Sequence, residues 1–186
     1  SAIWQNAHVI VFFLDETFEE ISCDLTTTVS EAMKQLADII KLQNYSTFTL
    51  FECRKMVGAR ATEDSVDEHI MLDDNKYIAD VLFDMKNPKN ARDGIQSKLL
   101  VKKRMFRETD EAITEPQFIN LSYIQAQYDY LLGNFPFVQE DTAQLCALQI
   151  QAEYGTSILN NEEELSNAVI KYIPKQVNEP FFLTDM

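Results

Sequence analysis

Residues 8–14 read HVIVFFL and residues 18–25 read FEEISCDL, two β-branched and aromatic runs separated by the polar segment Asp15-Glu16-Thr17. Runs of this composition on either side of a short polar turn are typical of a β-hairpin. We expect this hairpin to begin a sheet against which the next part of the chain packs.

A helix is expected directly after the hairpin. Thr28 and Glu31 have the spacing of a capping box, in which the Thr side chain accepts from the Glu amide and the Glu side chain reaches back. Apolar residues then recur at three- and four-residue steps from Val29 to Ile40. This pattern predicts one buried helical face that ends near Leu42.

The following segments return to strand and loop patterns. Residues 47–53 (TFTLFEC) and 97–106 (SKLLVKKRMF) predict strands, whereas residues 55–68 and 87–94 are polar and predict loops. Asp73-Asp74-Asn75 is expected to cap a short helix that ends near residue 84. The order strand, strand, helix, strand, loop, helix, strand predicts a β-grasp unit, whose last strand lies beside its first.

The pattern changes to a helical period from residue 111 onward, and strand patterns disappear. A first helix is expected to start at Pro116 and to end at Gly133. A second is expected from Glu140 to Gly155, with acidic residues at the favourable end of the helix dipole. A third begins near Asn161, and together the three helices predict a small bundle.

The charge balance also shifts near residue 106. The net charge is −14, of which residues 1–105 carry −4 (17 acidic and 13 basic) and residues 106–186 carry −10 (13 and 3). We therefore predict an α+β fold with a mixed lobe over residues 6–107 and an all-α lobe over residues 112–186. The acidic surface disfavours nucleic acid as a partner.

Enzyme and cofactor patterns are missing from the sequence. No G-x-x-x-x-G-K-[ST] stretch is present to bind nucleotide phosphates. Cys23, Cys53 and Cys146 have no C-x-x-C spacing and are expected to be reduced thiols in the core of a cytoplasmic protein. We predict no catalytic residue, no cofactor and no small-molecule substrate.

Metal binding is not expected either. His8 and His69 have no second ligand at a suitable spacing. Asp73-Asp74-Asn75 superficially suggests calcium, but Ile78 stands where an EF-hand loop needs glycine.

Several stretches resemble FERM domains, which join a ubiquitin-like lobe, an acyl-CoA-binding-protein-like helical lobe and a pleckstrin-homology-like lobe. The pattern in YLLGNFP (130–136) is shared widely among them, whereas VFFLDETFEEI (11–21) is more specific to plant kinesin-like calmodulin-binding proteins. A myosin with the same kind of tail is the nearest alternative. The other stretches that carry the resemblance are LFECRK (50–55), LDDNKYI (72–78), LSYIQ (121–125) and DTAQLCALQ (141–149).

The resemblance implies a role in a larger motor. Such kinesins move toward microtubule minus ends and carry a myosin-tail-homology and FERM tail, while their motor, ATP site and calmodulin-binding helix lie outside this sequence. We therefore expect a non-catalytic module that docks protein partners, cargo or the adjacent tail region, and that is cytoplasmic and associated with the cytoskeleton.

The resemblance also implies that the helical lobe is incomplete. The family's helical lobe continues with another helix after Phe181-Phe182-Leu183, and its third lobe is absent from this sequence. We expect the region beyond Gly155 to be less protected from hydrogen exchange than the β-grasp core.

Two charged clusters are candidate contact sites. Glu162-Glu163-Glu164 is either a solvated helix start or a docking surface for a basic segment. A basic cluster is either a contact for an acidic partner or lipid headgroups, or simply the water-facing side of a strand, with Lys102 and Arg104 on one face and Lys103 on the other. Its members are Lys98, Lys102, Lys103, Arg104 and Arg107.

Two alternative functions follow. The basic cluster could anchor a membrane or phosphoinositide adaptor, although the net charge opposes it. Acyl-CoA binding by the helical lobe rests on analogy of fold alone.

Overall fold

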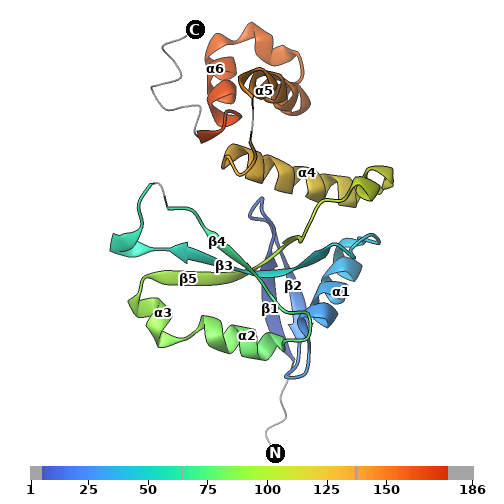
Figure 1. Cartoon of the computed structure of the whole chain (residues 1–186), viewed down its shortest axis with the longest axis vertical. Coiled ribbons are helices and arrows are strands. Elements are labelled where there is room, and N and C mark those ends of the chain that lie inside the picture. The colour runs from blue at the N-terminus through green and yellow to red at the C-terminus, as the bar shows by residue number, and fades with distance from the viewer. Residues whose placement is uncertain (1–5, 64, 137, 176–186) are drawn as a thin grey trace, which may run out of the picture. The chain divides into compact units, whose positions relative to one another are not determined.

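The computed structural model describes residues 6–63, 65–136 and 138–175. The chain divides into two compact units, Ser1–Gln125 and Ala126–Met186. The first contains a five-stranded sheet with helices and the second is helical (Figure 1). This is the predicted α+β fold. The prediction for Phe181-Phe182-Leu183 and beyond lies outside the described residues.

The sheet has the predicted β-grasp topology. The hairpin is formed by β1 (Ala7–Phe12) and β2 (Phe18–Cys23), which are antiparallel. The last strand, β5 (Ile95–Lys103), lies parallel to β1 and antiparallel to β3 (Phe48–Met56). β4 (Glu68–Met71) pairs with the outer side of β3, which gives the order β2-β1-β5-β3-β4.

The first helix, α1 (Val29–Ile40), begins as the sequence predicts. Glu31 N donates to Thr28 Oγ1 at 3.2 Å and Thr28 N donates to Glu31 Oε2 at 2.9 Å, which completes the capping box. Lys41 adopts a left-handed conformation with φ of 58° and ends the helix.

The sequence patterns miss two short elements. β4 begins at Glu68, the last residue of the predicted 55–68 loop, and its strand conformation depends on antiparallel pairing with the extended part of β3. α3 (Pro88–Arg92) lies in the predicted 87–94 loop. Asn87 Oδ1 accepts from Lys89 N at 3.0 Å, so this Asn-Pro pair starts a helix rather than a turn.

The predicted capping of α2 (Ile78–Met85) by Asp73-Asp74-Asn75 is wrong. The helix starts after Tyr77, whose side chain makes no cap. Segment 76–78 is instead held against segment 27–29, because Val29 N donates to the Lys76 carbonyl and Ile78 N donates to the Thr27 carbonyl, both at 2.9 Å.

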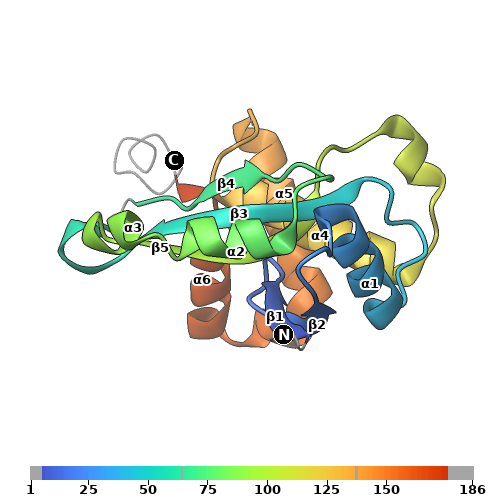
Figure 2. The same cartoon turned by 90° about the horizontal axis from the view of Figure 1, so that it is seen from below.

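The main core lies between the sheet and helices α1 and α2, which occupy the same side of the sheet (Figure 2). Alternate strand residues point into this core, as the two-residue period of a strand requires. The inward-facing strand residues include Val9, Val11, Ile21, Leu50, Leu99 and Val101.

The segment after the sheet folds back onto the first unit. Its 3-10 helix η2 (Glu108–Ala112) is followed by α4 (Pro116–Leu131). Glu115 Oε1 accepts from Gln43 N at 2.6 Å and Glu115 Oε2 accepts from Asn44 N at 2.9 Å. Burial raises the pKa of Glu115, but these hydrogen bonds outweigh burial and lower it overall.

Further along α4, Phe118 is buried in the main core, and its ring meets that of Phe48 edge-on at 5.9 Å. The first compact unit extends through Gln125.

The second unit contains the end of α4 and the other two predicted helices, α5 (Gln139–Tyr154) and α6 (Glu162–Lys171). Gly155 follows α5 with φ of 65°, and the 3-10 helix η3 (Ser157–Asn160) connects it to α6. The buried residues of this unit's apolar cluster are Cys146, Ile150, Ile158, Ala168 and Tyr172.

Candidate interaction surface

The residues of the predicted basic cluster lie on different faces of the sheet. Lys98 and Lys102 alternate with the core residues Leu99 and Val101 and therefore lie on the face opposite α1. Lys103 lies on the core side, as the alternation predicts. The structure thus separates residues that are adjacent in sequence.

Lys98 and Lys102 cover aromatic rings on the face opposite α1. Lys98 Nζ lies 4.7 Å from the centre of the Phe12 ring, and Lys102 Nζ lies 4.7 Å from that of Phe51. Each lysine packs its methylene chain on apolar surface and keeps a positive charge above a ring face.

Lys103 is fully buried, with a side-chain exposure of 0%. Its ammonium group donates to Asp110 Oδ2 at 2.6 Å and lies 4.3 Å from the ring centre of Phe118 and 4.8 Å from that of Phe106. This position removes Lys103 from the surface, and its role in the structure is to join β5 to η2 and α4.

Arg107 and Arg104 also hold parts of the first unit together. Arg107 Nε and Nη2 donate to Asp110 Oδ1 at 3.1 and 3.0 Å. Hydrogen bonds from Lys103 and Arg107 outweigh burial and lower the pKa of Asp110 to about 2. Arg104 is paired with Asp74, and its hydrogen bond lowers the pKa of that carboxyl.

Backbone groups at the end of β5 are satisfied by a glutamine. Lys103 N donates to Gln125 Oε1 at 2.7 Å, and Gln125 Nε2 donates to the Lys103 carbonyl at 2.9 Å. Gln35 does the same for Ser22 on edge strand β2, at 2.6 and 3.1 Å. No local sequence pattern predicts either pair of hydrogen bonds, because each glutamine lies far along the chain from the strand residue that it bonds.

A further candidate surface is the outer sheet face, defined here as the side opposite α1. Phe51, Cys53 and Leu100 are buried there under neighbouring side chains, and Phe12 and Leu14 pack against them. Three large apolar residues on this face are exposed, at 46%, 59% and 55% respectively: Ile10, Phe18 and Met71.

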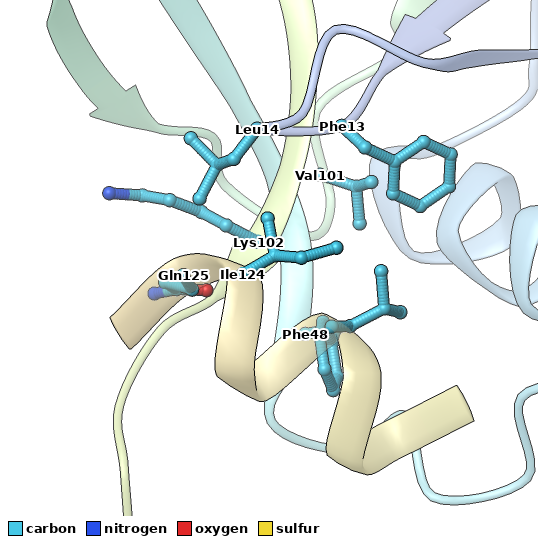
Figure 3. Close-up of a pocket in the computed structure, with 8 residues that line it drawn as sticks. Phe13, Leu14, Phe48, Val101, Lys102, Ile124 and Gln125 are labelled. Carbon is cyan, nitrogen blue, oxygen red and sulfur yellow. The ribbon is translucent and has the colours of Figure 1, made fainter. Parts of the chain in front are cut away.

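A small gap lies where the end of β1 approaches α4 (Figure 3). Phe13, Leu14 and Val101 line one side, and Ile124 and Gln125 of α4 line the other. Its volume of about 10 Å³ is roughly the least that holds one water molecule. It is therefore a packing gap and not a ligand pocket.

The acidic triplet Glu162-Glu163-Glu164 forms the first turn of α6, where the Asn161 side chain caps Glu164 N at 3.1 Å. Glu163 and Glu164 border an open hollow of about 430 Å³ that Tyr154 and Lys171 also line. Lys171 is paired with Glu153 at 2.8 Å.

The cysteines are buried, as predicted. Burial raises the pKa of Cys23 and of Cys53 to about 11, so both thiols are protonated and poor nucleophiles at neutral pH.

Among the residues that the structure describes, no group of three or more His, Cys, Asp and Glu side chains is arranged to hold a metal ion. Within the described ranges, no helix is both long enough and apolar enough to cross a membrane.

The chain thus combines a β-grasp sheet with a helical unit, and three residues of the basic cluster, Lys103, Arg104 and Arg107, are held in ion pairs within the first unit. Two family models match the chain in that order: the RA like domain over residues 5–105 and the FERM central domain over residues 108–181. The chain therefore carries an RA like domain followed by a FERM central domain. FERM domains are generally non-catalytic interaction modules.

Two plant proteins are similar to the chain in sequence. Kinesin-like protein KIN-14I of Oryza sativa subsp. japonica is 52% identical over 174 residues, and Kinesin-like protein KIN-14E of Arabidopsis thaliana is 49% identical over 174 residues. Each match covers 90% of this chain and 14% of the relative. The chain thus spans a small part of the length of these relatives.

Solved structures share the fold at lower sequence identity. The myosin VII MyTH4-FERM MF2 domain of Dictyostelium discoideum has a TM-score of 0.72 and 16% identity, covering 93% of this chain and 34% of that one. The human myosin 7b C-terminal MyTH4-FERM domain, solved in complex with the harmonin-a PDZ3 domain, has a TM-score of 0.64 and 17% identity, with coverage of 93% and 34%.

Proposed function

We propose that the chain is a protein-docking module in the tail of a microtubule-based motor of the kinesin type with a myosin-tail-homology and FERM tail. The observation that carries this proposal is the identity of 52% and 49% to two plant kinesin-like proteins across 90% of the chain. Motor activity and cytoskeletal association belong to the proposal, because the chain corresponds to 14% of each relative.

The geometry supports docking through a rigid surface. The pair of Lys103 and Asp110 fastens η2 to β5, and the hydrogen bonds of Glu115 fasten the start of α4 to Gln43 and Asn44. Binding by such a preorganised scaffold loses little conformational entropy. In this proposal the chain contributes recognition, and ATP hydrolysis takes place elsewhere in the parent protein.

The test is to excise residues 1–186 from the parent protein. We expect microtubule-stimulated ATP turnover per motor to persist, and recruitment of the motor to its site of attachment to be lost. Recruitment that survives excision would overturn the docking function, and loss of ATP turnover in the folded motor would overturn the non-catalytic role.

The tail of an unconventional myosin is the second candidate parent. Its support is the shared fold of the myosin VII MyTH4-FERM domain, with a TM-score of 0.72. The sequence encoded next to this chain distinguishes the two parents, because a myosin motor and a kinesin motor have unrelated sequences around their ATP sites.

Lipid and acyl-CoA binding have weaker support. Lys103, Arg104 and Arg107 of the basic cluster are engaged with carboxylates inside the first unit, which leaves less charge for anionic headgroups. Flotation with phosphatidylserine vesicles tests the membrane adaptor, and thermal stabilisation by an acyl-CoA tests the second alternative. We expect neither ligand to bind.

A further inference from the structure

The outer sheet face combines exposed apolar side chains with a positive charge. Phe12 and Phe18 are 5.8 Å apart between ring centres, with Ile10 exposed beside them on β1. The ammonium group of Lys98 lies above the Phe12 ring. Contiguous exposed apolar side chains are typical of interaction sites.

The positive charge on this face extends along β3 and β5. Lys55 and Cys53 alternate with Arg54, so Lys55 lies on the same side as Lys98, and both lysines act electrostatically on the Cys53 thiol. Lys102 lies further along β5 over Phe51. In a chain of net charge −14, this alignment of lysines is a local exception.

Two carboxylates also lie on this face. Glu20 Oε1 is 2.6 Å from His8 Nδ1, and Asp67 Oδ2 accepts from Cys53 Sγ at 3.7 Å. Around the Cys53 thiol, Lys55 and Lys98 thus face one carboxylate, that of Asp67, which leaves a net positive charge beside the apolar centre of the face.

We propose that the outer sheet face binds an acidic amphipathic helix of a partner protein. The helix would place its apolar stripe on Phe12, Phe18 and Met71 and direct its carboxylates toward Lys55 and Lys98. Charge complementarity selects the partner, because an acidic segment is repelled by most of this chain and attracted here.

A protein segment fits this face better than a membrane does. An anionic membrane would face the whole chain, whose charge of −14 opposes adsorption, whereas a single helix meets the outer sheet face alone. The inference rests on the proposed docking function and specifies the surface and the partner class.

The probe is a synthetic amphipathic helix with Leu and Phe on one side and Glu on the other, added to the intact 186-residue chain. We expect backbone amide shifts to concentrate at Phe12, Phe18 and Met71 in NMR spectra. A peptide that does not bind, or that shifts other residues instead, overturns the proposal.

Charge reversal tests the electrostatic part. The double variant Lys55→Glu with Lys98→Glu should bind the acidic peptide about tenfold more weakly or worse. It should also gain affinity for the same peptide with Lys in place of Glu. The control, Lys34→Glu with Lys89→Glu, makes the same charge change at exposed positions on α1 and α3 and should stay within about twofold.

Loss of folding is checked with Lys55→Met and Lys98→Met. These changes keep most of each methylene chain and remove only the charge, so the chain should fold and bind the acidic peptide more weakly. Unchanged binding in either pair of variants overturns the charge selection.

Vesicles of phosphatidylcholine with phosphatidylserine provide the competing surface. Vesicle binding that depends on Lys55 and Lys98 and displaces the peptide would overturn the inference in favour of a membrane. If the chain binds the peptide but a parent protein that lacks the chain is still recruited, this inference is upheld and the proposed motor-tail function is overturned. If recruitment of the parent requires the chain but the chain does not bind the peptide, the proposed motor-tail function is upheld and this inference is overturned.

Discussion

Lys103 and Asp110 form an ion pair inside the first unit, with a 2.6 Å hydrogen bond between Nζ and Oδ2 and side-chain exposures of 0% and 8%. The two partners differ in their other contacts. Arg107 also donates to Asp110, so the carboxylate has two cationic partners, whereas Lys103 is surrounded by aromatic rings. Removal of the Asp110 side chain and removal of the Lys103 side chain should therefore lower the free energy of unfolding by different amounts.

The first prediction concerns this asymmetry. Asp110→Ala leaves a buried ammonium group without its carboxylate and should lower the free energy of unfolding by about 3–5 kcal/mol. Lys103→Met leaves Asp110 paired with Arg107 and should cost about 1–2 kcal/mol. Urea unfolding followed at amides of β5 measures both, with exposed Lys34→Met as the control. Equal losses would contradict the account.

The second prediction concerns acid. The folded pKa of Asp110 is about 2, below the value of 3.8 that is usual for an Asp side chain, so its contribution to stability is complete above the unfolded pKa and disappears as pH falls toward 2. The first unit should lose stability between about pH 5 and pH 2. Asp110→Asn should make the stability of the first unit depend less steeply on pH. An Asp110 carboxyl resonance that titrates near pH 4 would refute the lowered pKa.

The third prediction compares two glutamines with the same hydrogen-bond pattern. Gln125 bonds the backbone of buried Lys103, and Gln35 bonds that of partly buried Ser22. Gln125→Ala should cost about 1–3 kcal/mol and Gln35→Ala less, because water reaches an edge strand more easily. Exchange of the Lys103 amide should rise only in the first variant. A larger loss for Gln35→Ala would count against this explanation.

The fourth prediction concerns the second unit. Its described apolar cluster has five buried residues, against nineteen in the main core, so less apolar surface opposes local opening. Amides of α6 should exchange faster than those of β3 and β5. The measurement is native-state hydrogen exchange of the intact chain, and equal protection in the two units would show the prediction to be wrong.

Local sequence patterns predicted much of the fold. The capping box of Thr28 and Glu31 and the hairpin of β1 and β2 depend on residues close in the chain, and both are confirmed. The short elements β4 and α3 were missed. β4 has only four residues and depends on pairing with β3, while the Asn87-Pro88 signal fits a turn and a helix start equally well.

The candidate site was harder to predict for a physical reason. Alternation along β5 places Lys103 opposite Lys102 correctly, but no local pattern shows that Asp110 and the rings of Phe48 and Phe118 meet the Lys103 side chain. The outer sheet face likewise combines residues from all five strands. Contacts between distant segments, and not propensity, decide which lysines remain at the surface.

The central claim, that this chain docks a protein partner for a motor, is tested most directly by recruitment of the parent protein in living cells. The fraction of motor at its attachment site is measured for the intact parent, for a parent lacking residues 1–186, and for one with Lys55→Glu and Lys98→Glu. We predict recruitment of the intact parent, none after excision, and a reduced fraction after charge reversal. Recruitment of the excised parent at the level of the intact one would contradict the claim.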